Sequence, residues 1–321
     1  MDPAPHFADR LIERVEATRS HLVVGLDPDL RELPGELLDG AGDLAGAAAA
    51  AEAFATAVID GVAELVPAVK PQSAFFEALG SAGVAALERV EAHARAAGLL
   101  VIEDAKRGDI GNTMAAYASA ALGRVRIGDD ELPVHDADAV TVSPYLGPES
   151  LEPMVDVARR FGKGLFVLVR TTNPGSGELQ DLRIADGAGE GGLLHQRVAA
   201  MVDALGAEGV GERGYADVGA VTGLTHPEQA PALRALMPRA YLLVPGLGAQ
   251  GGRPEDFAGY LDDDGLGAVA AASRSIAGGW RARAGGAEPA LTAIRAGAAT
   301  AAAATNAQLA EALAVADRLR W

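Results

Sequence analysis

The sequence of 321 residues contains no cysteine. It can therefore form no disulfide, no thiolate metal site and no cysteine nucleophile. Basic residues are also in deficit, because 27 lysines and arginines face 44 acidic residues and leave a formal net charge of -17. This balance argues against a broad nucleic-acid-binding surface, which needs a basic face, but it is compatible with a small basic pocket for a phosphate.

An uninterrupted apolar run of membrane-spanning length is not expected either. Glu52, Asp60 and Glu64 interrupt the alanine-rich stretch in which they lie. The first 20 residues lack the apolar centre of an export signal and predict an amphipathic helix instead. Its apolar residues share one helical face: Phe7, Leu11, Ile12 and Val15. We expect a cytoplasmic protein.

Eight short apolar segments recur along the chain, and each ends in a loop signal and is followed by a helical pattern. The segments are residues 21–29, 67–76, 99–109, 139–147, 164–175, 217–226, 241–252 and 267–276. Strands that are apolar on both faces and alternate with helices predict a parallel sheet that is covered on both sides. Eight such units in one chain predict an α/β fold of the closed (β/α)8 type, a TIM barrel.

A doubly wound open sheet is the alternative fold. It is disfavoured because the first predicted strand is followed by Asp27-Pro28-Asp29, and not by the G-x-G-x-x-G loop of dinucleotide-binding sheets. We therefore expect a single TIM-barrel domain with extended rim loops over residues 1–321. Its expected parts are an N-terminal helix (1–20), the barrel strands and helices (21–276) and closing helices (277–321).

Two connections are longer than a minimal barrel requires. Residues 30–47 extend the first connection, and residues 176–192 extend the loop after the fifth strand. The second segment is polar and rich in glycine, and it leaves the end of the barrel where active sites lie. We interpret it as a mobile lid or a rim loop.

Charged residues collect where the predicted strands end, which in a TIM barrel is the active-site end. The segment VIEDAKRGDIGNT (101–113) places Asp104 and Lys106 two residues apart, and so on one face of a strand. Lys70, at the end of the neighbouring strand, would meet them, and an ammonium between carboxylates keeps its charge. The alternative is a solvated ion pair worth ~0–1 kcal/mol. Lys70 brings a third charge to the same end of the barrel, and this favours a catalytic site over a solvated ion pair.

The last two predicted strands carry a second signal. PGLGAQGG (245–252) is a glycine-rich loop whose free backbone N–H groups could hold an anion. Arg274, after the eighth strand, could hold a phosphate with two parallel hydrogen bonds. The glycines could instead serve only a tight turn. Because Gln250 and Arg274 both lie at the rim, we predict a phosphate site here, where barrel enzymes often have one.

With these motifs the chain resembles the orotidine 5'-phosphate decarboxylase family. The pattern D-x-K-x-x-D-I is met by Asp104, Lys106, Asp109 and Ile110, and the resemblance runs from about residue 25 to about residue 276. VKPQSAFFE, RTTNPGSGELQ and PGLGAQGG are similar to the longer bacterial subgroup of that family. The resemblance implies conversion of orotidine 5'-phosphate to uridine 5'-phosphate (UMP) and carbon dioxide, in pyrimidine biosynthesis, without a metal or cofactor.

The resemblance also implies roles for the matching residues. Lys70, Asp104, Lys106 and Asp109 would form an alternating charge network in which Lys106 protonates carbon 6 of the pyrimidine. The protein would be a homodimer, with Asp109 reaching into the partner's site. The implied substrate-binding residues are Asp27 at the ribose, Ile110 and Thr113 beside Asp109, Thr172 at the pyrimidine, and Pro245, Gln250, Ser273 and Arg274, of which Gln250 and Arg274 hold the phosphate.

Two other functions stay open. Sugar-phosphate decarboxylases and hexulose-phosphate synthases share the D-x-K-x-x-D pattern but use magnesium and have an acid where this chain has Lys70. An oxygen-ligand magnesium site would not accept an ammonium there. A non-catalytic nucleotide-binding barrel would be favoured by a missing lysine or aspartate, and none is missing.

Two acidic segments suggest metal ions only at first sight. His135-Asp136-Ala137-Asp138 and LDDDG (261–265) both precede predicted strands, at the end of the barrel that serves stability. The six histidines show no ligand spacing such as H-E-x-x-H. We interpret these residues as solvated or structural.

Overall fold

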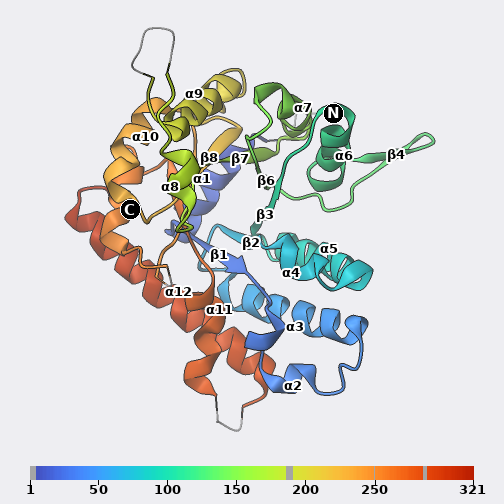
Figure 1. The fold of residues 1–321 in the computed structure, drawn as a ribbon. Coiled ribbons are helices and arrows are strands. Elements are labelled where there is room, and N and C mark those ends of the chain that lie inside the picture. Colours follow the sequence, from blue (N-terminus) through green and yellow to red (C-terminus); the bar gives the residue numbers. More distant parts are fainter. Residues whose placement is uncertain (1–4, 186–190, 249, 285–287) are drawn as a thin grey trace.

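Eight parallel strands close into a barrel in the computed structural model, which describes residues 5–185, 191–248, 250–284 and 288–321 (Figure 1). The barrel strands are β1 (Leu22–Leu26), β2 (Ala68–Pro71), β3 (Leu100–Arg107), β6 (Ala139–Val142), β7 (Gly164–Arg170), β8 (Val218–Thr222), β9 (Leu242–Pro245) and β10 (Ala268–Ala272). Neighbours in this order pair in parallel, and β10 pairs with β1. The predicted TIM barrel is confirmed, and each strand lies inside the segment predicted for it.

Helices surround the barrel. The α-helices are α1 (Phe7–Thr18), α2 (Gly35–Leu38), α3 (Leu44–Val62), α4 (Ser73–Glu77), α5 (Gly80–Ala96), α6 (Gly111–Ala121), α7 (Glu152–Phe161), α8 (Ser176–Gln180), α9 (Leu194–Gly206), α10 (Ala230–Leu236), α11 (Arg274–Ala277) and α12 (Ala290–Val315). The 3-10 helices are η1 (Leu30–Glu32), η2 (Pro148–Ser150), η3 (Pro227–Gln229), η4 (Pro254–Tyr260) and η5 (Gly278–Arg283).

Side chains alternate between two apolar layers along each strand. On β3, Val101 packs in the layer between the barrel and its helices, whereas Leu100 and Ile102 pack in the barrel interior. The alternation follows from the two-residue period of a strand. It directs Glu103 outward and Asp104 inward, and so decides which of two adjacent acids reaches the centre of the barrel.

The N-terminal helix α1 closes one end of the barrel. Phe7 and Leu11 are buried with the interior residues, and the ring of Phe7 meets that of Phe166 edge-on at 5.9 Å. Gly164, the first residue of β7, makes this possible, because an added Cβ would lie 2.2 Å from Cδ1 of Phe7. Since α1 seals the amino ends of the strands, a ligand can enter the barrel only at their carboxyl ends.

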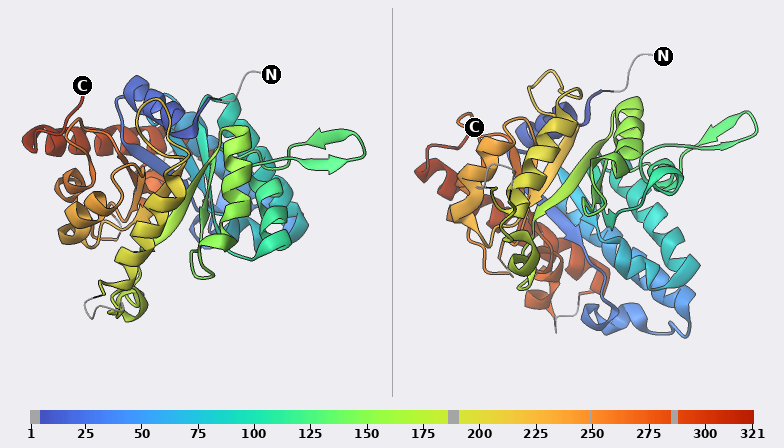
Figure 2. Two further views of the ribbon diagram at one scale, coloured as in Figure 1. Left: turned by 90° about the horizontal axis from the view of Figure 1, so that it is seen from above. Right: turned by 45° about the horizontal axis from the view of Figure 1, so that its top comes forward.

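A two-stranded hairpin that the sequence analysis did not predict follows α6. Its strands β4 (Val125–Ile127) and β5 (Asp130–Leu132) pair antiparallel and are exposed throughout. Gly128 forms the turn at φ +64°, a conformation that glycine adopts without strain. Figure 2 shows the hairpin projecting away from the barrel. The segment is short and largely polar, so its pattern did not reveal a pair of strands.

The two extended rim segments contain short helices. Residues 30–47 form η1, α2 and the start of α3. The segment 176–192 begins with α8, and residues 186–190, the centre of the predicted lid, lie outside the described residues.

In the described part of the chain, α3 alone is long and apolar enough to cross a membrane by length and composition. The run is not uninterrupted, because Glu52 and Asp60 lie within the helix as the sequence analysis noted, but two charges leave its mean hydropathy high in a segment so rich in alanine. Half of its apolar window is buried, and the helix packs against α5 and α12. Such burial is typical of a core helix.

The closing role of α1 predicts a large stability difference between two leucines. Leu11→Ala should lower the free energy of unfolding by ~2–5 kcal/mol, because Leu11 is fully buried in the barrel interior. Leu291→Ala on α12, where the side chain is 44% exposed, should change it by no more than about 0.5 kcal/mol. Urea unfolding of both variants measures the difference. Equal effects would show that α1 does not close the barrel as described.

Candidate active site

A cavity of about 490 Å³ opens at the carboxyl ends of the barrel strands. Its volume falls in the ~300–1,000 Å³ range of small-molecule sites. Nine residues predicted for the site line it: Asp27, Lys70, Asp104, Lys106, Thr172, Pro245, Gln250, Ser273 and Arg274. The prediction therefore placed residues from the ends of six different strands around one cavity, although they are spread over about 250 positions of the chain.

The carboxylate of Asp104 lies between two ammonium groups. Nζ of Lys70 is 2.5 Å from Oδ2, and Nζ of Lys106 is 2.6 Å from Oδ1. Asp104 and Lys70 are buried, whereas the Lys106 side chain is 45% exposed toward the cavity. The chain contains only three lysines, so two of the three are committed to this one carboxylate.

Opposite charges keep the buried pair ionised. Burial by itself raises the pKa of the Asp104 carboxyl, but the charges of Lys70 and Lys106 outweigh it and hold that pKa well below its usual range. Burial likewise lowers the pKa of Lys70, but Asp104 and then Asp27 outweigh burial, so the pKa is raised. Asp104 and Lys70 are therefore both charged at neutral pH.

Two residues that the sequence analysis missed hold Asp104 in place. The hydroxyl of Thr141 donates to Oδ1 at 2.9 Å, and Nε2 of Gln72 donates to Oδ2 at 3.1 Å. Gln72 lies two residues after Lys70, a spacing that could have indicated a shared face. Thr141 offered no such signal, because only the barrel register brings β6 beside β3.

The backbone at Lys106 departs from a regular strand. Its φ is +50°, and the pairing of β3 with β6 shifts register between Glu103 and Arg107. The backbone N–H of Lys106 donates to Oγ1 of Thr141 at 2.9 Å, which fixes this conformation. A positive φ at a residue other than glycine costs ~1–3 kcal/mol, and such strained conformations cluster at active sites.

Asp27 follows β1 and faces the same cavity. Its Oδ1 atom is buried and accepts no hydrogen bond from any residue that the structure describes. A buried carboxylate oxygen without a donor is costly, so this atom is available for a donor from a ligand.

The glycine-rich loop after β9 is only partly what the sequence predicted. The amides of Gly248, Gly251 and Gly252 donate to carbonyl groups within the loop, so they form its turn and are not free to hold an anion. The cavity wall here is made instead by Gln250 with Ser273 and Arg274. The predicted role in holding an anion therefore does not extend to the amides of these three glycines.

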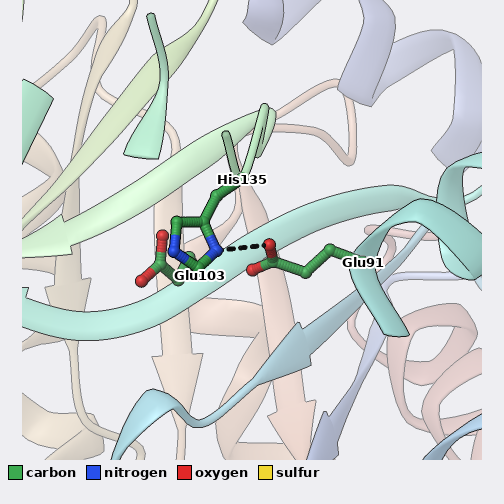
Figure 3. A group of neighbouring side chains, drawn as sticks. All are labelled: Glu91, Glu103 and His135. Carbon is green, nitrogen blue, oxygen red and sulfur yellow. Dashed lines mark hydrogen bonds and ion pairs between the residues drawn. The ribbon is translucent and has the colours of Figure 1, made fainter. Parts of the chain in front are cut away.

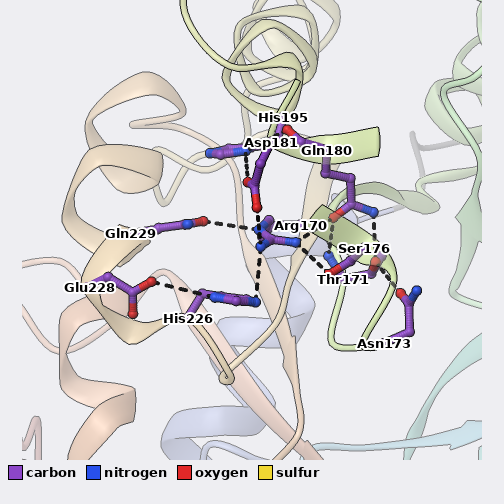
Figure 4. Close-up of polar contacts among 10 residues, drawn as sticks. All are labelled: Arg170, Thr171, Asn173, Ser176, Gln180, Asp181, His195, His226, Glu228 and Gln229. Carbon is purple, nitrogen blue, oxygen red and sulfur yellow. Dashed lines mark hydrogen bonds and ion pairs between the residues drawn. The ribbon is translucent and has the colours of Figure 1, made fainter. Parts of the chain in front are cut away.

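A buried arginine that the sequence analysis overlooked organises the rim beside the cavity (Figure 4). Arg170 ends β7 and is 2% exposed. Its guanidinium donates to Ser176 at 2.7 Å, Gln180 at 3.1 Å and Asp181 at 2.9 Å. It also contacts His226 and Gln229, which follow β8. Arg170 could have been identified from the sequence, because it is a charged residue at the end of an otherwise apolar strand.

The hydrogen bonds of Arg170 hold the start of the 176–192 segment against the barrel. Gln180 accepts from the backbone N–H of Thr171 at 2.9 Å and donates to its hydroxyl at 2.7 Å, and it lines the cavity. The first turns of the predicted lid are thus a fixed wall of the cavity, next to Thr172.

Three predicted site residues do not reach the cavity of their own chain. Asp109, Ile110 and Thr113 lie on the connection from β3 to α6 and do not line it. Ile110 is 61% exposed, and the carboxylate of Asp109 accepts the backbone N–H of Ile110 at 2.8 Å. The single chain leaves these side chains on its surface.

The two acidic segments have partners of their own. Asp138 accepts from Arg10 at 2.6 Å and from the backbone N–H of Val101 at 2.9 Å. Asp262 accepts from the hydroxyl of Tyr215 at 2.5 Å. Both roles are structural, as the sequence indicated.

A family model described as Orotidine 5'-phosphate decarboxylase / HUMPS family matches residues 20–280. The chain belongs to this family. The family covers the whole barrel, from the end of α1 to the start of η5. The predicted resemblance is therefore confirmed.

Individual members of the family agree with this assignment. The orotidine 5'-phosphate decarboxylase of Rhodopirellula baltica is 48% identical over 272 residues, covering 84% of this chain and 87% of that protein. The enzyme of the same name from Deinococcus radiodurans is 43% identical over 279 residues, covering 85% and 89%. The solved structure of Leishmania donovani OMP decarboxylase has a TM-score of 0.71 at 31% identity, covering 96% and 98%. These relatives support the predicted enzyme class, a carboxy-lyase.

The charge arrangement predicts how Asp104 titrates. Because its pKa is depressed, its ionised form stabilises the fold above the ordinary aspartate pKa of ~3.9, and this stabilisation is lost as the pH falls through the lower folded value. Lys70→Met removes one of the two ammonium groups and should raise the pKa of Asp104. Carboxyl ¹³C NMR of labelled aspartate measures the shift.

Lys163→Met is the matched control, because Lys163 is the third lysine and pairs with Asp136 and Asp138 away from the cavity. It should leave the Asp104 titration unchanged. An Asp104 pKa that is ordinary in the unmodified protein, or that does not respond to Lys70→Met, would contradict the arrangement.

Proposed function

We propose that this chain is an orotidine 5'-phosphate decarboxylase that forms UMP and carbon dioxide. The observation that carries the proposal is the Asp104 carboxylate held between Lys70 and Lys106 at the base of a nucleotide-sized cavity. Family membership supports the same activity. The proposal treats residues 1–321 as one catalytic domain that works in the cytoplasm in pyrimidine biosynthesis.

The proposed substrate lies with its phosphate at the β9–β10 rim and its pyrimidine over Lys106. Arg274 and Gln250 bind the phosphate, with Ser273 and Pro245 completing that wall, because a guanidinium forms strong charge-assisted hydrogen bonds to phosphate. The unpartnered Oδ1 of Asp27 accepts a ribose hydroxyl. Thr172, which follows β7 and lines the cavity, contacts the pyrimidine.

In the proposed reaction the bond between carbon 6 and the carboxylate carbon breaks, and carbon dioxide leaves. The electron pair stays on carbon 6, and the ammonium of Lys106 gives its proton to that carbon. UMP results, and Lys106 regains a proton from water through its exposed side. Asp104 keeps the Lys106 ammonium directed into the cavity until the transfer.

Electrostatic magnitudes decide which charge contributes most. Repulsion between Asp104 and the substrate carboxylate is worth ~4 kcal/mol at 4 Å and an effective dielectric constant of 20. Enzymes lower barriers by ~8–23 kcal/mol, and by more for the slowest reactions. Repulsion alone is too small, so the main term is the fixed Lys106 cation facing the charge that develops at carbon 6. Binding energy from the phosphate positions the ring.

Lys70 distinguishes this activity from that of the magnesium-dependent relatives. Its buried ammonium donates to Asp104 and interacts with Asp27, so it lies where a magnesium ion would need oxygen ligands. The proposed reaction uses no metal and no cofactor.

The proposed active form is a homodimer. Asp109 is half-buried in the single chain, with the exposed Ile110 and Thr113 beside it, and would enter the cavity of the partner subunit. There the Asp109 carboxylate would follow Lys106 in the alternating series of charges formed by Lys70, Asp104 and Lys106. The exposed Ile110 side chain would be covered by the same contact.

An ultraviolet assay with orotidine 5'-phosphate in excess EDTA tests the activity. Loss of the orotidylate absorbance is expected, and Lys106→Ala should slow turnover by at least ~10²–10⁴-fold, since the proton donor and the main cation are removed. Lys163→Ala should turn over normally because Lys163 pairs outside the cavity. No turnover with tight UMP binding would indicate a non-catalytic barrel. Near-normal turnover by Lys106→Ala would refute the assigned role.

A mixing experiment tests the shared site. Asp109→Ala and Lys106→Ala should each be nearly inactive alone. If the partner supplies Asp109, mixed dimers contain one site with both defects and one intact site. Equal mixing should then restore about a quarter of the normal activity, as expected for a two-fold symmetric dimer. Absence of recovery in mixtures shown to exchange subunits would place Asp109 in the site of its own chain, or outside any site.

A further inference from the structure

Three ionisable side chains meet behind the active site, on the outer face of β3 (Figure 3). They are Glu91 from α5, Glu103 from β3 and His135 from the segment before β6. Each offers a ligand atom, and these atoms lie within 4.8 Å of one another. His135 lies 32 residues from Glu103 and 44 from Glu91, so no local sequence pattern joins the three side chains.

Both carboxylates have an oxygen without a partner. Glu91 is 0% exposed and Glu103 is 2% exposed. Oε1 of Glu91 and Oε2 of Glu103 accept no hydrogen bond within the described ranges of the chain. A cluster that served only as a buried ion pair would leave two buried anionic oxygens unsatisfied, which is rare and costly.

The other atoms of the cluster are held by neighbours. Oε1 of Glu103 accepts from the hydroxyl of Ser73 at 3.0 Å, and Oε2 of Glu91 is 2.9 Å from Nδ1 of His135. The guanidinium of Arg95 donates to the carbonyl oxygen of His135 at 2.7 Å. Supporting hydrogen bonds of this kind orient the side chains that bind metal ions in proteins.

We infer that Glu91, Glu103 and His135 form a binding site for a zinc-like divalent cation. Two carboxylates and one imidazole are donors that zinc accepts, whereas magnesium and calcium prefer oxygen ligands alone. The two carboxylates and a neutral imidazole cancel the charge of the ion. Ligands at ~2.0–2.2 Å from zinc lie ~3.3–3.6 Å apart in a tetrahedron, so an inward shift of about 1 Å closes the site.

The site is structural by its position. Glu103 directly precedes Asp104 on β3, with its side chain on the opposite face of the strand. A cation bound there joins α5, β3 and the segment before β6, and so braces the strand that carries Asp104 and Lys106. The inference does not depend on the proposed decarboxylase activity, because metal binding is measured without substrate.

The test uses full-length protein that has been treated with EDTA and then freed of it. Titration with zinc chloride by calorimetry should show one ion bound per chain, and cobalt chloride should give visible absorption bands of a nitrogen and oxygen site. The zinc-bound protein should also unfold at a higher temperature than the metal-free protein, because an ion that binds only the folded state stabilises that state.

Two variants and one control locate the ion. Glu103→Gln and His135→Gln should each lose the cobalt spectrum and the thermal shift. His93→Gln should keep both, because His93 pairs with Asp60 at the surface with about 40% of each side chain exposed. Circular dichroism confirms that each variant is folded.

The unmodified protein alone can overturn the inference. Failure to bind zinc or cobalt would show that the cluster holds only a proton. Binding that survives in both Glu103→Gln and His135→Gln would place the ion elsewhere. Either result leaves the decarboxylase proposal untouched, since that proposal requires turnover in EDTA.

Discussion

The contact of Asp104 with two lysine ammonium groups is the constraint on which the site depends. Asp104 is buried at the end of β3, and it stays ionised only because Lys70 and Lys106 lie within 2.6 Å of its two oxygens. Removing either lysine would leave a buried charge short of a partner, which is strongly destabilising. The same contacts direct the Lys106 ammonium into the cavity. Stability and proposed catalysis thus rest on one set of charges.

The barrel brings the charges of Lys70, Asp104 and Lys106 together. Parallel pairing of β2 with β3 and of β3 with β6 brings Lys70, Asp104 and Thr141 to one level of the barrel. Because α1 fills the opposite end with Phe7 and Leu11, the cavity opens on one side only. Arg170 fixes the rim next to Thr172 through a buried network. The charges therefore lie in a rigid, largely enclosed setting, where electrostatic effects are strong.

Much of this could be predicted from the sequence, because parallel barrel strands are apolar on both faces and end in polar loops. All eight strands and the nine cavity residues followed from that pattern and from the family motif. Thr141 could not be predicted, because a threonine in an apolar strand indicates a site only when the register of that strand against its neighbour is known. The Glu91–His135 contact joins residues 44 apart and depends on how α5 packs. Asp109 does not line the cavity of its own chain, so the single chain does not show the place that the resemblance implies for it.

Hydrogen exchange at carbon 6 of UMP tests the central claim most directly. Exchange and decarboxylation would pass through the same carbanion, and both would need the Lys106 ammonium that Asp104 holds in place. In D₂O, ¹H NMR should show slow loss of the H6 signal of UMP with the unmodified enzyme, and no loss with Lys106→Ala under the same conditions. Equal exchange by the two proteins would contradict the account, because carbon 6 would then receive its proton from another group.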